Sequence, residues 1–349
     1  MALVDLAGKD SEPSAATVAI QKVRIADGIN QFVTAADGYV PNGNSVVFVN
    51  DSDILVYDTF TRPSTAQSLL EEIRQITDKP VRYVVNSHWH PDHWSGNEVF
   101  ARAFPELEII ATEETRRLML NVANAWPTFF AEQLLRLEAT LEKQKQTAAA
   151  SDAAAPTAEQ LSKDEKEIRE RAGFVAEARI VQRTYPTLTF TDELTLRPRG
   201  REFQLTSMVG DAYGSTVLYA PRDRILVTGD LLVSPVPYFT PLEQHAESLR
   251  KLDAVDAAVI VPGHGPAFHD KNYLRLERAL LESVLGQVRQ AHERGIVTIE
   301  EIRKTVDLES FRSKFTRDEA ELEEEWRMSM DVMIEFASVQ SRGGAKFQY

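Results

Sequence analysis

The motif H-x-H-x-D-H at residues 88–93 constrains the fold more than any other part of the chain. It directly follows the apolar run at residues 81–86, which is typical of a buried strand. Pro91 stops the strand, so Asp92 and His93 turn back toward the first two histidines. Imidazole nitrogens and carboxylate oxygens are the ligands that zinc and related divalent ions prefer. Because three of the seven histidines fall within six residues, the motif predicts a metal site at the carboxyl end of a strand.

The size and composition of the chain predict a globular protein that acts on a small molecule. With 349 residues, 43% of them hydrophobic, it can form one large layered domain with helical additions or about two domains. The absence of cysteine excludes disulfides, a cysteine zinc site and a thiol nucleophile. The net charge of −14 argues against nonspecific binding to nucleic acid or an anionic bilayer, and no apolar run is long enough for a membrane helix.

The amino-terminal sequence carries no basic region followed by an apolar one, as a signal peptide would. As written, the chain is therefore expected in the cytoplasm. A periplasmic or secreted protein whose signal peptide had been removed would have the same sequence.

Short apolar strands alternate with amphipathic helices up to about residue 112, which is typical of a layered α/β sandwich. A capping-box pattern at 64–67 predicts the start of the first helix. The following stretch is helical and rich in Ala, Glu, Lys and Gln, and predicts an inserted helical hairpin. We divide the chain into an N-terminal extension (1–24), the first half of a sandwich (25–112), the inserted hairpin (113–185), the second half (186–269) and a C-terminal helical extension (270–349).

Two later segments are suited to complete a metal site. A strand at 225–228 ends in Gly229-Asp230, which places a carboxylate at a strand tip. A second strand at 259–261 leads into a Pro-Gly-His-Gly turn that exposes His264. The glycines let the backbone approach closely and adopt unusual dihedral angles beside a metal.

These motifs occur in the order found in the metallo-β-lactamase fold superfamily, which the chain resembles over about 25–112 and 203–268. The resemblance implies an α/β fold, a four-layer αββα sandwich, with a one- or two-metal site in a cleft along one edge. It implies two divalent ions, zinc foremost, with iron or manganese as alternatives. Carried over residue by residue, the first metal would be bound by His88 and His90, the second by Asp92, His93 and His264, and both by Asp230.

One position departs from this pattern. The family usually supplies a third histidine to the first metal from a segment before a strand, and the matching position here is Asp211. Three readings follow: Asp211 is the ligand, His245 replaces it, or the first site is weakened or empty. An aspartate would lower the Lewis acidity of the first metal and shift its preference toward manganese or iron.

Several side chains around the motifs are candidates for contact with a substrate. Asp92 is expected to orient the attacking water or accept its proton, and Tyr213 to donate its hydroxyl to an oxyanion. Tyr238 and Phe239 follow Asp230 in a loop suited to substrate contact. Residues 124–130, which are rich in aromatics, are a candidate lid, whereas Trp89 alternates with the ligands and is expected to pack inward.

We therefore predict a metal-dependent hydrolase in which a metal-bound hydroxide attacks a carbonyl, in a β-lactam-like amide, a lactone or a thioester. One alternative is a mononuclear iron oxygenase of the same fold, and another is a degenerate, non-catalytic metal-binding module. The fold does not decide the substrate. A homodimer through the C-terminal or inserted helices is a further possibility.

Overall fold

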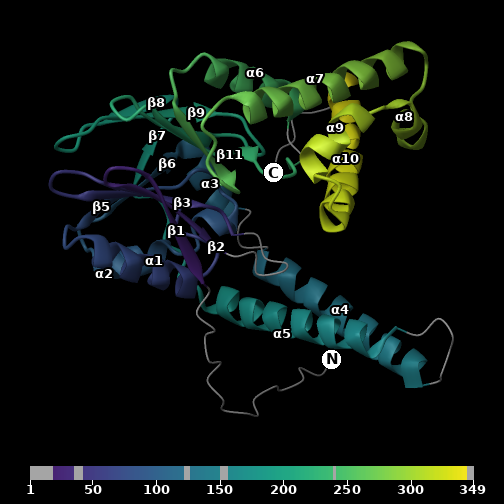
Figure 1. Ribbon diagram of the computed structural model, residues 1–349, viewed down its shortest axis with the longest axis horizontal. Coiled ribbons are helices and arrows are strands. Elements are labelled where there is room, and N and C mark those ends of the chain that lie inside the picture. Colours follow the sequence, from purple (N-terminus) through teal and green to yellow (C-terminus); the bar gives the residue numbers. More distant parts are fainter. Residues whose placement is uncertain (1–18, 35–41, 122–125, 150–155, 239–240, 344–349) are drawn as a thin grey trace.

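Two sheets stacked face to face form the centre of the molecule in the computed structural model, which describes residues 19–34, 42–121, 126–149, 156–238 and 241–343 (Figure 1). The first sheet has the order β1-β2-β3-β4-β5-β6-β7. Its strands are β1 (Ile20–Ala26), β2 (Ile29–Thr34), β3 (Ser45–Val49), β4 (Ile54–Tyr57), β5 (Val81–Val85), β6 (Glu108–Thr112) and β7 (Leu188–Phe190). The second sheet has the order β12-β11-β10-β9-β8. Its strands are β8 (Glu193–Leu196), β9 (Phe203–Met208), β10 (Ser215–Ala220), β11 (Ile225–Val233) and β12 (Val259–His264).

Helices cover the outer face of each sheet, which gives the four layers α-β-β-α. Helices α1 (Pro63–Ile76) and α2 (Asn97–Ala103) pack on the first sheet. Helices α6 (Leu242–Asp253) and α7 (Asn272–Glu293) pack on the second (Figure 1). This arrangement confirms the predicted αββα sandwich.

The alternation of side chains along the strands explains the layers. In β3, Phe48 points into the core between the sheets, while Val47 packs against α1 and α2. In β11, Val227 points into the same central core, and Leu226 faces α6 and α7. Both faces of each sheet are apolar at these strands, so each sheet is buried on both sides.

Helices α3 (Glu113–Asn121), α4 (Trp126–Ala149) and α5 (Ala158–Ile180) separate β6 from β7 in the sequence. Helices α4 and α5 lie side by side and project away from the sandwich (Figure 1). Strand β7 then pairs in parallel with β6, so the first sheet is completed by a strand that follows these helices.

The base of the projecting helices is fixed to α1. Glu177 of α5 accepts hydrogen bonds from the backbone N–H of Ser64 (2.7 Å) and from its hydroxyl (3.0 Å). The capping-box prediction at 64–67 is therefore wrong: α1 begins at Pro63, and its N-cap residue Arg62 makes no side-chain cap. A carboxylate from α5 satisfies the free N–H instead, which also suits the helix dipole.

The C-terminal helices extend from the end of α7 (Figure 1). They are α8 (Ile299–Thr305), α9 (Glu309–Thr316) and α10 (Ala320–Ser341). The apolar stripe of α10, which includes Trp326, Met330 and Met333, joins the core that α6 and α7 form with the second sheet. In the described ranges, no helix has the length and apolar character that crossing a bilayer requires.

Candidate metal centre

The seven residues predicted as metal ligands meet at one edge of the sandwich in two clusters. Each offers one ligand atom, and within each cluster these atoms all lie within 4.8 Å of one another. The cluster termed the first site contains His88, His90, Asp211 and Asp230, and the one termed the second site contains Asp92, His93 and His264.

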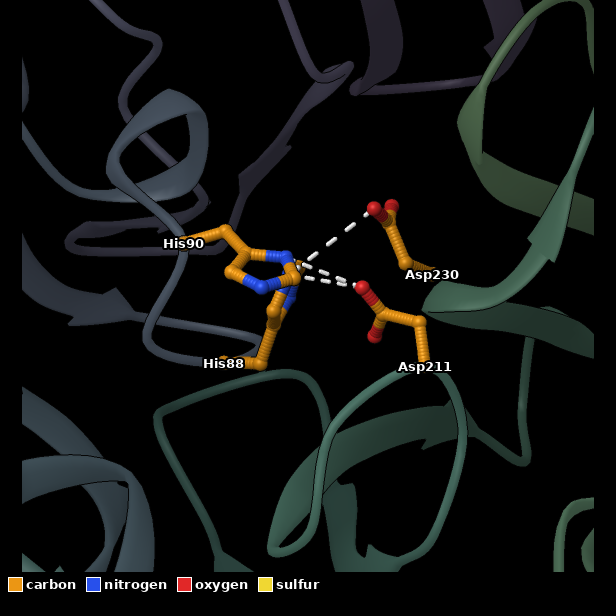
Figure 2. Close-up of side chains that lie close together, drawn as sticks. All are labelled: His88, His90, Asp211 and Asp230. Carbon is orange, nitrogen blue, oxygen red and sulfur yellow. Dashed lines mark hydrogen bonds and ion pairs between the residues drawn. The ribbon is translucent and has the colours of Figure 1, made fainter. Parts of the chain in front are cut away.

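The first site joins two histidines from the loop after β5 to Asp211, from the loop between β9 and β10, and Asp230, from β11 (Figure 2). Asp211 Oδ2 lies 2.9 Å from His90 Nδ1 and 3.5 Å from His88 Nε2. Asp230 Oδ2 lies 3.8 Å from the same His88 nitrogen. The two imidazoles approach each other at 2.9 Å, between His88 Nε2 and His90 Nδ1. Four ligand atoms therefore face one small volume.

The second site is formed by the short 3₁₀ turn Pro91–His93 and the end of β12. Asp92 Oδ2 lies 3.2 Å from His93 Nε2 and 3.2 Å from His264 Nε2. Asp230 also reaches this site, because its Oδ1 lies 3.4 Å from His93 and its Oδ2 3.3 Å from His264. Asp230 thus borders both sites and is placed to bridge them.

Asp58, which follows β4, orients the second site and is absent from the sequence-based set. Its Oδ2 lies 2.7 Å from His93 Nδ1, so Nε2 of that ring faces the cluster. Its Oδ1 accepts the backbone N–H of Ser87 at 2.7 Å. The hydroxyl of Ser87 in turn lies 2.9 Å from His88 Nδ1. Such outer partners fix the tautomer and the orientation of a ligand ring. One feature of the sequence could have indicated this role. Asp58 directly follows β4, and β4 pairs in parallel with β5, the strand that leads into the ligand loop.

Two glycines permit the close packing of Asp230. At Gly229, where φ is +54°, a Cβ would lie 2.6 Å from the Cβ of Ser87. At Gly263, a Cβ would lie 1.8 Å from Asp230 Oδ1. Strand β11 also continues through Asp230 to Val233, with register shifts around Gly229, rather than ending at Asp230 as expected. The backbone bend at Gly229 turns the carboxylate toward the ligands.

Opposite charges in the two clusters hold the carboxylates of Asp92 and Asp230 ionised. Burial raises the pKa of Asp230, but His264 and His93 outweigh it and hold the pKa well below its usual range. Burial lowers the pKa of His264, whereas Asp230 and Asp92 raise it to about 10. Burial dominates at His88 and lowers its pKa to about 4. Asp92, Asp230 and His88 are therefore in the forms that bind metal, and a divalent ion would displace protons from the second-site imidazoles.

Several buried polar atoms of the two clusters accept or donate no hydrogen bond, which tests whether the residues fit metal ions. They are His93 Nε2, His264 Nε2, Asp211 Oδ1 and Asp230 Oδ1. Unpartnered polar atoms are costly in a folded interior. Because all four belong to the nitrogen and oxygen donors that divalent metals prefer, the residues fit a pair of metal ions.

The structure also shows where Asp211 and His245 lie, the two residues considered for the position at which the family usually has a histidine. Asp211 is buried and contacts both histidines of the first site. His245 lies on α6, where its Nε2 donates to the carbonyl of Leu231 at 2.8 Å. Burial lowers the pKa of His245 to about 4. The structure therefore does not bring His245 into the first site, and its Nε2 is engaged by a backbone carbonyl outside the cluster.

Aromatic residues enclose the first site. Trp89 is buried, as predicted, and its ring lies 4.4 Å from that of His90. Trp126, at the start of α4, lies 5.9 Å from His90 on centroids and stacks on Phe130 at 5.4 Å. The candidate lid at 124–130 thus contacts a candidate ligand through Trp126, while Asn124 and Ala125 lie outside the described residues.

Of the two candidate tyrosines, only Tyr238 makes a ring contact with a candidate ligand within the described residues. Tyr213 is half-buried, and burial raises the pKa of its hydroxyl. Tyr238 packs against the second site, with its ring centroid 5.7 Å from that of His264. Phe239, its predicted neighbour in substrate contact, lies outside the described residues.

The fold and the clusters define a class of protein, an αββα sandwich whose edge carries a site suited to two metals. The family model described as metallo-beta-lactamase superfamily matches residues 38–264. The chain belongs to the metallo-β-lactamase superfamily, as its sequence predicted.

Sequence comparison finds a linear primary-alkylsulfatase from Pseudomonas sp. (strain ATCC 19151), 24% identical over 269 residues, which are 72% of this chain and 47% of that protein. Among solved structures, the sec-alkylsulfatase Pisa1 from Pseudomonas sp. matches with a TM-score of 0.61 and 14% identity, over 92% of this chain and 50% of that one. A metallo-β-lactamase from Pontibacter korlensis matches with a TM-score of 0.53 and 18% identity, over 76% of this chain and 99% of that one. The chain spans about half the length of both alkylsulfatases.

Proposed function

We propose that this chain hydrolyses an ester bond of a small molecule at a pair of divalent metal ions, zinc foremost, with iron or manganese as alternatives. The observation that carries the proposal is the convergence of seven ligand residues in two clusters, with several of their buried polar atoms making no hydrogen bond. In this proposal His88, His90 and Asp211 hold the first ion, Asp92, His93 and His264 hold the second, and Asp230 contacts both. The carboxylate of Asp211 favours a harder ion at the first site.

Bound zinc would supply Lewis acidity and lower the pKa of a coordinated water to about 7. The protein would add orientation and proton transfer. Asp92 Oδ2 lies between His93 and His264, so it is placed to orient the water or to take its proton. Tyr213 keeps its proton at neutral pH because burial raises its pKa, so it can donate a hydrogen bond to a developing oxyanion.

A sulfate monoester is the substrate class that the comparisons favour. A primary and a secondary alkylsulfatase emerge from two different comparisons. The structural match to the sec-alkylsulfatase covers 92% of this chain, against 76% for the lactamase. Shared fold alone does not decide chemistry, so this remains a proposal about substrate.

A carbonyl substrate, predicted from the sequence as a β-lactam-like amide, a lactone or a thioester, is the second candidate. The half-buried hydroxyl of Tyr213, two residues from Asp211, favours it, because an uncharged donor suits the oxyanion of acyl transfer.

The test is a panel of a primary alkyl sulfate, a lactone, a thioester and a chromogenic cephalosporin, assayed with metal-loaded protein. We expect the alkyl sulfate to be hydrolysed fastest, and Asp92→Asn to slow that reaction while retaining folded protein. Faster turnover of the lactone or thioester would transfer the proposal to the carbonyl class. Bound metal with no turnover of any compound would favour the binding module, and dioxygen uptake with one bound iron would favour the oxygenase.

A further inference from the structure

The two carboxylates of the first site, Asp211 and Asp230, stand side by side on two different backbone segments (Figure 2). Asp211 lies in the loop between β9 and β10, and Asp230 lies in β11. Within the described residues, the pairing of β11 with β10 ends at Val227. Its pairing with β12 changes register between Gly229 and Val233. Regular strand pairing therefore does not by itself fix the position of either carboxylate.

Helix α6 contacts the segment that carries Asp230. The buried Nε2 of His245 donates a hydrogen bond of 2.8 Å to the carbonyl of Leu231, the residue that follows Asp230. Burial lowers the pKa of the His245 ring to about 4, so the ring is neutral at pH 7. Glu277 of α7 lies 3.9 Å from the same nitrogen, and burial raises its pKa well above the usual range, which favours its neutral form. His245 therefore acts on the Asp230 segment through a backbone contact rather than through charge.

The same face of α6 contacts the segment that carries Asp211. Ser248 lies three residues after His245, so the two side chains share a face of the helix. The buried hydroxyl of Ser248 accepts the backbone N–H of Val209 at 3.2 Å and donates to the carbonyl of Gln244 at 3.1 Å. Val209 lies two residues before Asp211, so one helix contacts the backbone beside both carboxylates of the first site.

The two carboxylate-bearing segments also pack directly on each other. A Cβ at Gly210 would lie 2.8 Å from Leu231 Cγ and 3.0 Å from Leu231 Cα. Gly210 directly precedes Asp211, and Leu231 directly follows Asp230. Because a close-packed interior transmits displacements, a shift of one segment would move the other.

We propose that His245 and Ser248 are positioning residues of the metal centre. In this inference His245 fixes the backbone beside Asp230, Ser248 fixes the backbone beside Asp211, and α6 sets the spacing of the two carboxylates. The inference rests on the proposed function, since it assumes that the two carboxylates hold metal ions. It gives His245 a role in the centre without making it a ligand.

The test measures the zinc affinities of both sites by chelator competition, and Asp211→Ala identifies which affinity belongs to the first site. His245→Leu should weaken both ions about tenfold, because Asp230 borders both sites; this is the lower end of the range for residues that support metal ligands. Ser248→Ala should weaken the first ion alone, since Asp211 belongs to the first site.

Two further variants separate positioning from general stability, with thermal melting of each metal-free protein. His245→Gln keeps an N–H donor on the side chain and should restore most of the affinity. Leu252→Ala is the matched control, because it removes a buried apolar side chain from the next turn of α6 and removes no hydrogen bond. It should lower the melting temperature and leave both affinities unchanged.

Unchanged affinities in His245→Leu and Ser248→Ala, or an equal loss in Leu252→Ala, would overturn the inference while leaving the hydrolase proposal intact. Ser248→Ala decides the question where His245→Leu does not fold. The expected pattern of affinities in a protein that hydrolyses none of the panel compounds would support this inference and overturn the hydrolase proposal. Failure of the wild-type protein to bind two ions would overturn the proposed metal pair, and this inference with it.

Discussion

In the second site the ring of His93 contacts a carboxylate, whereas in the first site the ring of His88 contacts a hydroxyl. His93 Nδ1 lies 2.7 Å from Asp58, and His88 Nδ1 lies 2.9 Å from Ser87 Oγ. The remaining imidazole of the first site, His90, has 24% of its side chain exposed and rests on aromatic rings. A buried carboxylate raises the basicity of a ligand imidazole more than a hydroxyl does. We therefore expect the second site to bind its ion more tightly and the two ions to bind in sequence.

Removal of the residue shared by both sites should have the largest effect. Asp230→Ala is expected to reduce the bound metal to less than one ion per chain, because its carboxylate borders His88, His93 and His264. Bound metals contribute several kcal/mol to transition-state stabilisation. Because about 1.4 kcal/mol corresponds to a tenfold change in rate, we expect activity to fall by about 10³-fold or more. Elemental analysis and kinetics check this, with the exposed Asp27→Ala as control. Two ions retained in Asp230→Ala would remove the bridging role.

Substitution of Asp211 should separate the two sites. Asp211→Ala is expected to lower the stoichiometry from two ions toward one, since it removes the ligand 2.9 Å from His90 and leaves the second site intact. Asp211→His should keep two ions, because imidazole also serves as a ligand. Metal titration followed by elemental analysis measures both. Full occupancy in the alanine variant would show that solvent, not Asp211, completes the first site.

Substitution of Asp58 and of Ser87, which contact ligand imidazoles, should lower metal affinity to different degrees. Asp58→Asn is expected to weaken the second site by about 10- to 100-fold. Asparagine is a suitable replacement because it tolerates the positive φ of 62° at this position. Ser87→Ala should weaken the first site by less. Chelator competition gives both affinities, and equal losses in the two variants would contradict the asymmetry between the sites.

The smallest effect is expected at the aromatic contact of the first site. Trp126→Ala removes the ring 5.9 Å from His90 and should weaken the first ion by about two- to tenfold, the usual range for one aromatic contact. The second ion should be unaffected. Phe129→Ala is the control, because that side chain is 48% exposed and contacts Trp126. A matching loss at the second site would indicate a general loss of stability.

The layers and the candidate ligands were predictable because their signals are local. Each strand carries its own two-residue alternation, and the motif at 88–93 holds four ligands in one loop. Asp230 and His264 were recognisable from the glycines beside them, which the close packing of the two strands requires.

The supporting residues were not predictable because their roles arise from contacts between distant segments. Asp58 resembles any aspartate after a strand until β4 pairs with β5. Glu177 reaches the start of α1 from 113 residues away. Their positions depend on tertiary packing, which no local pattern encodes.

Metal content is the most direct test of the central claim that the two clusters together bind two ions. Protein purified without chelator, dialysed against metal-free buffer and analysed for its elements should contain two divalent ions per chain. One ion lost well before the other during chelation would support the proposed difference between the sites. No more than trace metal, even after loading with zinc, manganese or iron, would contradict the account.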